Sequence, residues 1–235
     1  GGDGHRLVAF GEGADRLDRG PDNLVFTTLR EELDRLGVPV PPGAEVTALN
    51  AIPVASGLGS SSTATLAGVV FAHAIAADAA GRDPADLDLV AILERAVEVE
   101  GHGDNVAPAL LGGFVVVVPD GDRVLTQRVP TVPVRTVVCV PDYAYLTSQA
   151  RAALPASYSK ADAIFNIGRA MLVSEALREG DDDLLARAMD DRIHEPYRLG
   201  SVPGATAAKS GALEAGAICV ALSGAGPGIV AFARE

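Results

Sequence analysis

The stretch "IPVASGLGSSSTATLAG", residues 52–68, places a loop of glycines and serines directly before an apolar run. This pattern predicts a helix that begins among the serines. A helix N-terminus exposes unpaired N–H groups and carries partial positive charge, glycines allow close backbone approach, and hydroxyls can reach a phosphate or a metal. On the residues alone, the stretch fits equally a phosphate-binding loop and an ordinary serine-capped helix. It is not a Walker A loop, because no Gly-Lys-Ser/Thr follows.

The composition describes an acidic chain that can bury a core. It has 235 residues, of which 48% are hydrophobic, and a formal net charge of −12. This length suits one large or two modest domains. The negative charge argues against nucleic acids and membrane surfaces as partners, because both are polyanionic. A phosphate ligand would have to be attracted by local dipoles and a few arginines.

The two cysteines, Cys139 and Cys219, lie in separate apolar stretches and form no CxxC or metal-ligand pattern. We expect both to be buried, reduced thiols. The sequence shows no signal peptide and no evident apolar span of 18 residues. The cytoplasm is therefore the expected location.

Hydrophobic periodicity predicts helices and strands that alternate irregularly. Helices are expected at residues 23–37, 60–80, 83–101, 159–180, 182–193 and 205–216. Strands are expected at residues 5–10, 44–54, 112–121, 122–130 and 133–142, and two more within 217–235. With hairpins that look antiparallel, the pattern favours an α+β fold of two domains, residues 1–131 and 132–235.

The third expected helix carries specific local signals. Asp83 suits its N-cap and Pro84 its first helical position. Its buried stripe, spaced i, i+3, i+4, i+7, consists of Leu89, Ile92, Leu93 and Ala96. A step of about 100° per residue then turns Glu100 inward and Glu98 towards solvent. An inward carboxylate needs a partner such as Mg²⁺; the alternative is that Glu100 lies past the helix end and is solvated.

Five segments resemble one known family. Residues 53–68 closely resemble the central phosphate loop of the GHMP kinases. The segments "EGHGDNVAPALLGGF", "VPDYAYLTSQARAALP" and "AMDDRIHEPYR" are similar to segments of the homoserine kinases within that family, and "LSGAGPGIVAF" is similar to its third, glycine-rich motif. They occur in the family's order across nearly the whole chain. The resemblance implies a two-domain α+β architecture with a ribosomal-protein-like N-terminal domain and a ferredoxin-like C-terminal domain.

The same resemblance implies a function. The chain would use ATP and Mg²⁺ to phosphorylate the hydroxyl of L-homoserine, giving O-phospho-L-homoserine on the way to threonine, and a homodimer would be expected. One alternative is another GHMP small-molecule kinase, acting on mevalonate or a sugar. A second is a nucleotide-binding fragment without catalysis, because no segment here matches the family's N-terminal substrate-binding motif or its closing helix and strand.

The resemblance assigns nucleotide and metal roles to particular residues. The ATP-binding residues would be Asn23, Pro53, Gly57, Leu58, Gly59, Ser60, Ser61 and Ser62. Asn23 would lie near the adenine, and this role is compatible with that of a helix N-cap. Glu100 would be a magnesium ligand together with the hydroxyl of Ser61, with Ser62 as the alternative.

The acceptor end is assigned in the same way. Its residues would be His102, Arg151, Arg198, Ser223, Gly224 and Gly226. The two arginines would clamp the substrate carboxylate, because a guanidinium binds a carboxylate bidentately. Asn105 stands where sister enzymes carry a catalytic aspartate, which leaves no strong general base unless Asp104 supplies one. Phosphoryl transfer tolerates this, since it depends mainly on positioning and charge neutralisation.

Overall fold

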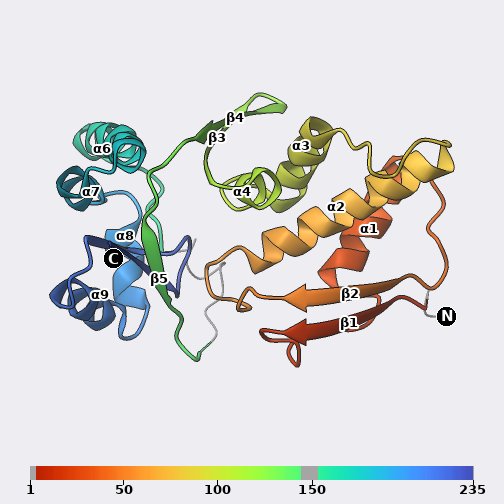
Figure 1. The fold of residues 1–235 in the computed structure, drawn as a ribbon, viewed down its shortest axis with the longest axis horizontal. Coiled ribbons are helices and arrows are strands. Elements are labelled where there is room, and N and C mark those ends of the chain that lie inside the picture. The colour runs from red at the N-terminus through yellow and green to blue at the C-terminus, as the bar shows by residue number, and fades with distance from the viewer. Residues whose placement is uncertain (1–3, 144–152, 235) are drawn as a thin grey trace. The chain divides into compact units, whose positions relative to one another are not determined.

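The structure is a computed structural model that describes residues 4–143 and 153–234 (Figure 1). The chain divides into two compact units. Unit 1 comprises Gly1–Val54 and Gly59–Arg128, and unit 2 comprises Ala55–Leu58 and Val129–Glu235. The division near residue 128 lies close to the boundary expected after residue 131, and the short segment 55–58 of the glycine-serine loop groups with unit 2.

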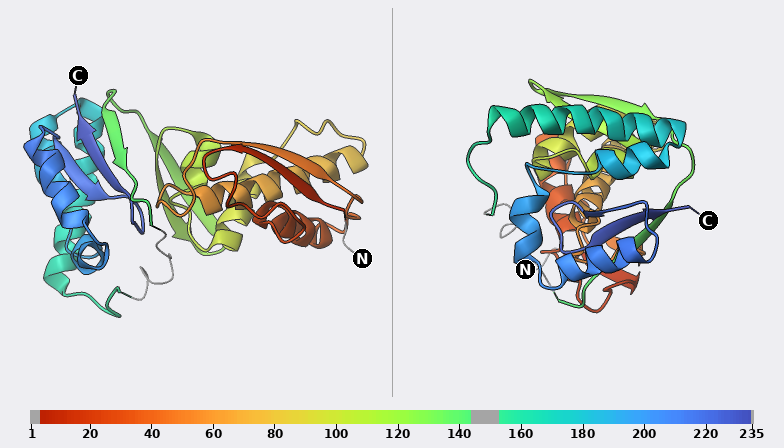
Figure 2. Two further views of the ribbon diagram at one scale, coloured as in Figure 1. Left: turned by 90° about the horizontal axis from the view of Figure 1, so that it is seen from below. Right: turned by 90° about the vertical axis from the view of Figure 1, so that its left-hand side faces the viewer.

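The first layer of unit 1 is a pair of parallel strands covered by helices. Strand β1 (Arg6–Gly11) pairs with β2 (Glu45–Asn50), with Arg6 opposite Glu45. A parallel pair requires a crossover connection, and helix α1 (Leu24–Arg35) lies within it. Figures 1 and 2 show α1 and α2 (Ser60–Ala79) on one side of the pair. The core between them contains Leu7, Ala9, Phe26, Leu29, Leu33 and Ala72.

The rest of unit 1 packs on the other part of α2. Helix α3 (Leu89–Glu100) and the short α4 (Val106–Leu111) are followed by the hairpin of β3 (Phe114–Asp120) and β4 (Arg123–Val129). A second core contains Leu66, Val69, Ile92, Leu93, Ala96, Val106 and Ala107. Because α2 contributes to both cores, it positions the serines at its start relative to the end of α3.

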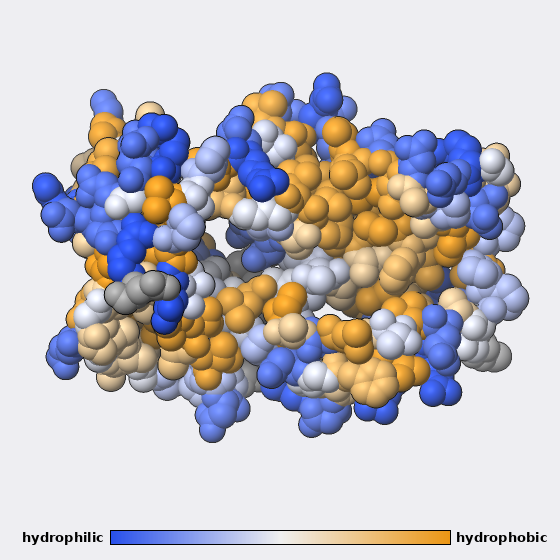
Figure 3. All heavy atoms as spheres, in the orientation of Figure 1, coloured by the Kyte–Doolittle hydropathy of each residue, from blue (hydrophilic) through white to orange (hydrophobic). Residues whose placement is uncertain are grey.

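Helix α2 is apolar around most of its circumference because it serves both cores. Helices that are hydrophobic on all sides are normally buried. By length and composition alone α2 could also cross a membrane, so the expectation that the sequence holds no such span is wrong. The evidence for a membrane span is nevertheless weak, since the core helix of a folded domain meets the same criterion. On the face drawn in Figure 3, apolar side chains gather over unit 1.

Unit 2 is built on a three-stranded antiparallel sheet. Its order is β5 (Arg135–Cys139), β7 (Ile229–Ala233), β6 (Cys219–Leu222). The green β5 and the blue β7 lie side by side in the left panel of Figure 2. The helical elements are α6 (Lys160–Glu179), α7 (Asp182–Ala188), α8 (Glu195–Arg198), η1 (Leu199–Ser201) and α9 (Ala205–Glu214). The core joins this sheet to α9 through Ala205, Val220, Leu222, Ile229 and Ala231.

The start of α3 corrects one prediction. The N-cap is Asp88, whose carboxylate accepts hydrogen bonds from the N–H groups of Val90 at 3.0 Å and Ala91 at 3.1 Å. Asp83 instead accepts from the N–H of Ala85 in a separate turn. Leu89, expected in the buried stripe, is exposed at the first position of the helix. The helices α4 and α8 were not predicted.

The cysteines correct another prediction. Cys219 is buried, as expected, and burial, followed by the nearby negative charge of Asp182, raises the pKa of its thiol to about 11. Cys139 is exposed, so the expectation of burial is wrong for it. The reason is its place on β5, an outer strand of the sheet whose residues are all exposed.

Candidate active site

The glycine-serine loop leads into α2 without a side-chain cap. Gly59 is the N-cap residue, with φ of 81°, and it makes no side-chain cap hydrogen bond to the first N–H groups of the helix. Ser60, Ser61 and Ser62 are the first three helical residues. The alternative of an ordinary serine-capped helix is therefore wrong. The hydroxyls that would have capped the helix remain available for other contacts.

Those hydroxyls gather on the carboxylate of Glu100 at the end of α3. Its Oε1 accepts hydrogen bonds from Ser61 Oγ at 3.2 Å and Ser62 Oγ at 2.7 Å, and its Oε2 accepts one from Thr65 Oγ1 at 3.0 Å. The side chain of Glu100 is only 12% exposed, whereas that of Glu98 is 72% exposed. The helical phase thus correctly predicted which carboxylate points inward.

Glu32 is a second inward-pointing carboxylate of unit 1, and its partners are those of a structural ion pair. Glu32 on α1 accepts hydrogen bonds from Arg35 and Arg95 and contacts His73 at 3.0 Å. Burial alone would raise the pKa of Glu32, but the bonds from Arg35 and Arg95, together with that of His73, outweigh it and hold the pKa at about 2. Glu32 is therefore fully neutralised by basic groups of the protein.

Glu100 differs because its partners are hydroxyls. Among the described residues, 4–143 and 153–234, Glu100 has no Lys or Arg partner. The basic side chain that lies near it there is His102, whose Nε2 is 3.9 Å from Oε1 of Glu100. Nowhere in those ranges do three His, Cys, Asp or Glu side chains gather as a metal site. A carboxylate with adjacent hydroxyls is nevertheless the oxygen donor set that Mg²⁺ uses when it retains several waters. The residues present fit that ion.

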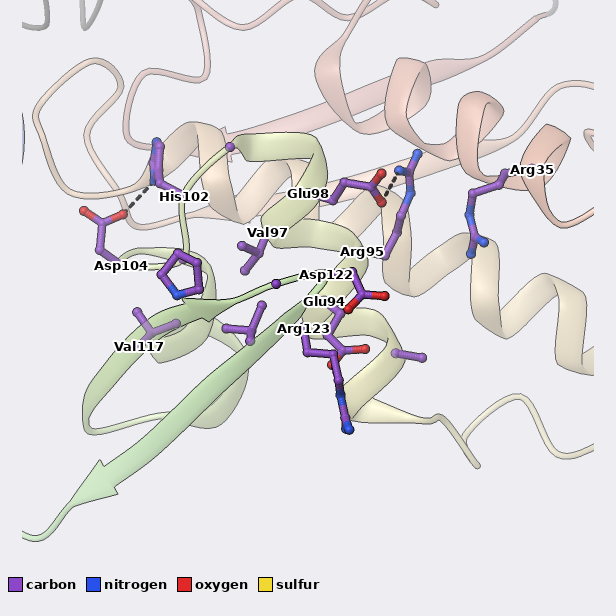
Figure 4. Close-up of a pocket in the computed structure, with 16 residues that line it drawn as sticks. Arg35, Glu94, Arg95, Val97, Glu98, His102, Asp104, Val117, Asp122 and Arg123 are labelled. Carbon is purple, nitrogen blue, oxygen red and sulfur yellow. Dashed lines mark hydrogen bonds and ion pairs between the residues drawn. The ribbon is translucent and has the colours of Figure 1, made fainter.

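The segment after Glu100 forms a compact polar turn. Nδ1 of His102 donates a hydrogen bond to Oδ1 of Asp104 at 2.6 Å, as Figure 4 shows. Both side chains line a cavity of about 850 Å³ formed by α3 and the β3–β4 hairpin of unit 1. Asn105 precedes α4 and lies against the loop, since a Cβ on Gly59 would stand 3.0 Å from its Oδ1. The turn therefore places Asn105, rather than Asp104, next to the glycine-serine loop.

Asn23 acts as the N-cap of α1. Its Oδ1 accepts from the N–H of Val25 at 2.9 Å, and its Nδ2 donates to the carbonyl of Asp18 at 2.7 Å. Asn23 is buried. The helix-cap reading is thus confirmed, while a place near the adenine stays a prediction.

In unit 2, Arg198 is buried at the end of α8, where its guanidinium contacts Nε2 of His194. Asp191 orders this segment by accepting hydrogen bonds from the N–H groups of Ile193, His194 and Glu195. Burial alone would raise the pKa of Asp191, but these donors outweigh it and keep the pKa below its usual value. Arg151, the other predicted clamp residue, lies outside the described residues.

The first half of the loop is held by the glycine-rich turn between β6 and β7. Ser223 Oγ donates to the carbonyl of Gly57 at 3.0 Å, and the N–H of Gly228 donates to the carbonyl of Ser56 at 3.1 Å. Gly57 has φ of 79°, and a Cβ there would lie 2.3 Å from the carbonyl oxygen of Ser223. Gly224 and Gly226 also have positive φ. These predicted residues therefore shape the backbone of residues 55–58 within unit 2.

Comparison with known proteins identifies the family. The sequence pattern of the GHMP kinases N terminal domain matches residues 23–113, and that of the GHMP kinases C terminal matches residues 173–235. The chain belongs to the GHMP kinase family. The two-domain α+β fold expected from the sequence is confirmed, and like other GHMP kinases this chain uses ATP.

Two similar curated proteins and one similar crystal structure are homoserine kinases. The homoserine kinase of Moorella thermoacetica is 40% identical over 229 residues, which cover 97% of this chain and 75% of the relative. That of Synechococcus sp. CC9311 is 38% identical over 242 residues, covering all of this chain and 73% of the relative. The crystal structure of homoserine kinase from Cytophaga hutchinsonii superposes with a TM-score of 0.79 at 31% identity, over 99% of this chain and 73% of that one.

More distant structures match in fold alone. The crystal structure of L. major mevalonate kinase in complex with R-mevalonate superposes with a TM-score of 0.66 at 17% identity, over 98% of this chain and 73% of that one. Sequence reasoning about this GHMP kinase missed Thr65 as a partner of Glu100. The signal was present, because Thr65 follows Ser61 and Ser62 by four and three residues and so lies on the same helical face.

Proposed function

We propose that this chain transfers the γ-phosphoryl group of ATP to the side-chain hydroxyl of L-homoserine, giving O-phospho-L-homoserine in threonine biosynthesis. The observation that carries the proposal is the Glu100 carboxylate, which meets the hydroxyls of Ser61 and Ser62 where the glycine-serine loop enters α2. The homoserine kinase relatives supply the acceptor. The enzyme is thus a phosphotransferase with an alcohol acceptor.

The start of α2 is the proposed phosphate site. Its first N–H groups have no side-chain cap, so they can bind phosphate oxygens, and the helix dipole favours the negative charge. Glu100 and the hydroxyl of Ser61 would hold Mg²⁺, with Ser62 contributing to the same cluster. Bound there, the ion would neutralise phosphate charge as the phosphoryl group is transferred.

The acceptor residues are proposed to orient homoserine. Arg151 and Arg198 would bind the α-carboxylate, and His102, fixed by Asp104, would contact the amino acid. Asn105 can hydrogen-bond the attacking hydroxyl but cannot take its proton, since an amide is not a base. Asp104 is the other candidate, but its carboxylate is already occupied by His102 at 2.6 Å. Positioning would then supply most of the rate enhancement.

We further propose a homodimer, as the resemblance leads us to expect, together with a cytoplasmic location and no nucleic acid or membrane as partner. The acidic net charge of −12 supports the exclusion of polyanionic partners. Sedimentation of the purified protein across a concentration series tests the dimer directly. A monomer at all concentrations would contradict it.

The activity is tested by a coupled ADP-release assay. We expect ADP release from ATP to depend on homoserine and on Mg²⁺, and to be much weaker with mevalonate or galactose. The assay should be run on this chain and on the same chain carrying any coding sequence that lies upstream. Nucleotide binding without turnover in both forms would favour the binding fragment, and preference for mevalonate or a sugar would favour another GHMP kinase.

A further inference from the structure

Two threonines near the start of α2 use their hydroxyls in different ways. Thr63 Oγ1 donates to the carbonyl of Gly59 at 3.0 Å, the local backbone bond that threonines commonly make in helices. Thr65 Oγ1 instead leaves its own helix and donates to Oε2 of Glu100 at 3.0 Å. The hydroxyl of Thr65 therefore connects α2 to the end of α3.

The three hydroxyl side chains around Glu100 differ in how far they are buried. Thr65 is 1% exposed and Ser62 is 2% exposed, whereas Ser61 is exposed and makes the longest contact, at 3.2 Å. Ser61 can therefore turn towards a ligand without opening the core. Thr65 cannot, because its hydroxyl is enclosed and faces the carboxylate.

The two oxygens of Glu100 are consequently in different environments. Oε1 lies on the side of Ser61 and Ser62, and Oε2 is bonded to Thr65. The terminal torsion of a glutamate is soft, so a carboxylate without a fixed partner samples many orientations. A hydrogen bond to one oxygen removes this freedom and fixes the direction of the other oxygen.

We propose that Thr65 is a positioning residue that holds Oε2 of Glu100 so that Oε1 faces the hydroxyl of Ser61, and that these two groups would hold a divalent cation. The inference rests on the proposed function, in which Glu100 and Ser61 hold Mg²⁺. Groups that orient a metal ligand without touching the metal typically contribute 10- to 100-fold to metal affinity. Thr65 is assigned that role here.

The test is the gain in ATP affinity that Mg²⁺ produces, measured by calorimetry with and without the ion. Thr65→Val keeps the side-chain shape and removes the hydroxyl, so we expect it to reduce this gain about tenfold. Thr65→Ser keeps the hydroxyl and should restore most of the gain. Thr63→Val is the matched control on the same helix, and it should leave the gain unchanged. ATP affinity without Mg²⁺ should be similar in all four proteins.

The variant Glu100→Gln separates a failure of the proposed metal site from a failure of the inference about Thr65. If it retains the full Mg²⁺ gain, the proposed metal site is wrong and the inference about Thr65 falls with it. If Glu100→Gln loses the gain and Thr65→Val keeps it, the metal site stands and the inference is overturned. Thermal unfolding is measured for each variant, and Thr65→Ala replaces Thr65→Val in the comparison if the latter does not fold.

Discussion

Oε2 of Glu32 on α1 accepts a hydrogen bond from Nε of Arg95 on α3 at 2.6 Å, deep inside unit 1. The same carboxylate contacts His73 on α2, so a single side chain joins α1, α2 and α3. Removing one member of a buried ion pair leaves the other charge without compensation, which is strongly destabilising.

We predict that Glu32 makes the stability of unit 1 depend on pH. Its pKa falls from 4.5 to about 2 on folding, and one pKa unit corresponds to about 1.4 kcal/mol, so the stabilisation is roughly 3 kcal/mol. Because the folded pKa is the lower one, this stabilisation is fully present above pH 4.5. It is lost as the pH falls through the range between 4.5 and about 2. Chemical denaturation at a series of pH values measures it.

Glu32→Gln should remove this acid-dependent part and lower the unfolding free energy near pH 7 by roughly 3 kcal/mol. Glu98→Gln is the control, because Glu98 also pairs with Arg95 but is largely exposed. An exposed pair contributes little, so this variant should unfold as the wild type does. Equal stability of the Glu32 and Glu98 variants would show that the buried network contributes nothing specific.

Gly59 is predicted to be required for nucleotide binding rather than for folding. A valine there must adopt a left-handed conformation and would push on Asn105, whose Oδ1 would lie 3.0 Å from the new Cβ. Gly81→Val is the matched control, since Gly81 also has positive φ, at the other end of α2, with nothing within 4 Å of its Cβ. Both variants should lose similar stability, about 1–2 kcal/mol. Only Gly59→Val should lose ATP binding in calorimetry, and unchanged ATP affinity in this variant would refute the phosphate loop.

The helical phase at the end of α3 leads to a further prediction. Glu100→Gln should weaken Mg²⁺-dependent turnover far more than Glu98→Gln, because only Glu100 points inward to the hydroxyls of α2. The measurement is turnover at several Mg²⁺ concentrations with ATP and homoserine saturating. Similar losses in the two variants would remove the reason for placing the metal at Glu100.

The sequence was informative where the signal is periodic and local. The stripe of Ile92, Leu93 and Ala96 correctly set the phase of α3, and that phase correctly separated Glu98 from Glu100. The start of the same helix was misplaced, because Asp83 and Asp88 are both good caps and local preference does not choose between them. In the structure the helix begins at Leu89 with Asp88 as its N-cap, so residues 83–87 lie before the cap.

Tertiary partners were beyond the reach of local patterns. Its spacing from Ser61 and Ser62 places Thr65 on their helical face, but no local pattern shows that this face meets α3, and Thr63, of the same type, bonds its own helix. The parallel pairing of β1 and β2 was likewise not predicted, since it depends on the crossover through α1. The exposure of Cys139 follows from the order of the strands, which an apolar stretch does not reveal.

The last prediction concerns the acceptor end. Arg198 is buried at the end of α8, where its guanidinium contacts His194, and we predict that it binds the carboxylate of the acceptor. A charge-assisted bidentate pair contributes about 1.5–3 kcal/mol. Arg198→Ala should therefore raise the KM for homoserine roughly ten- to a hundredfold, and Arg151→Ala should do the same. Arg198→Lys should recover only part of the affinity, because an ammonium cannot reproduce the planar fork.

Arg192→Ala is the control, because Arg192 belongs to the same segment but is half exposed and lies over the ring of Phe165. It should leave the KM for homoserine unchanged. The KM for ATP should change little in every variant, since the clamp acts on the acceptor alone, and this separates a binding role from general damage to unit 2. The measurement is a pair of saturation curves for each variant, one for homoserine and one for ATP, from which the two KM values are obtained. If the alanine variants at Arg151 and Arg198 keep wild-type homoserine affinity, the carboxylate of the acceptor is bound elsewhere, and these two arginines have no part in selecting homoserine over an acceptor without an α-carboxylate.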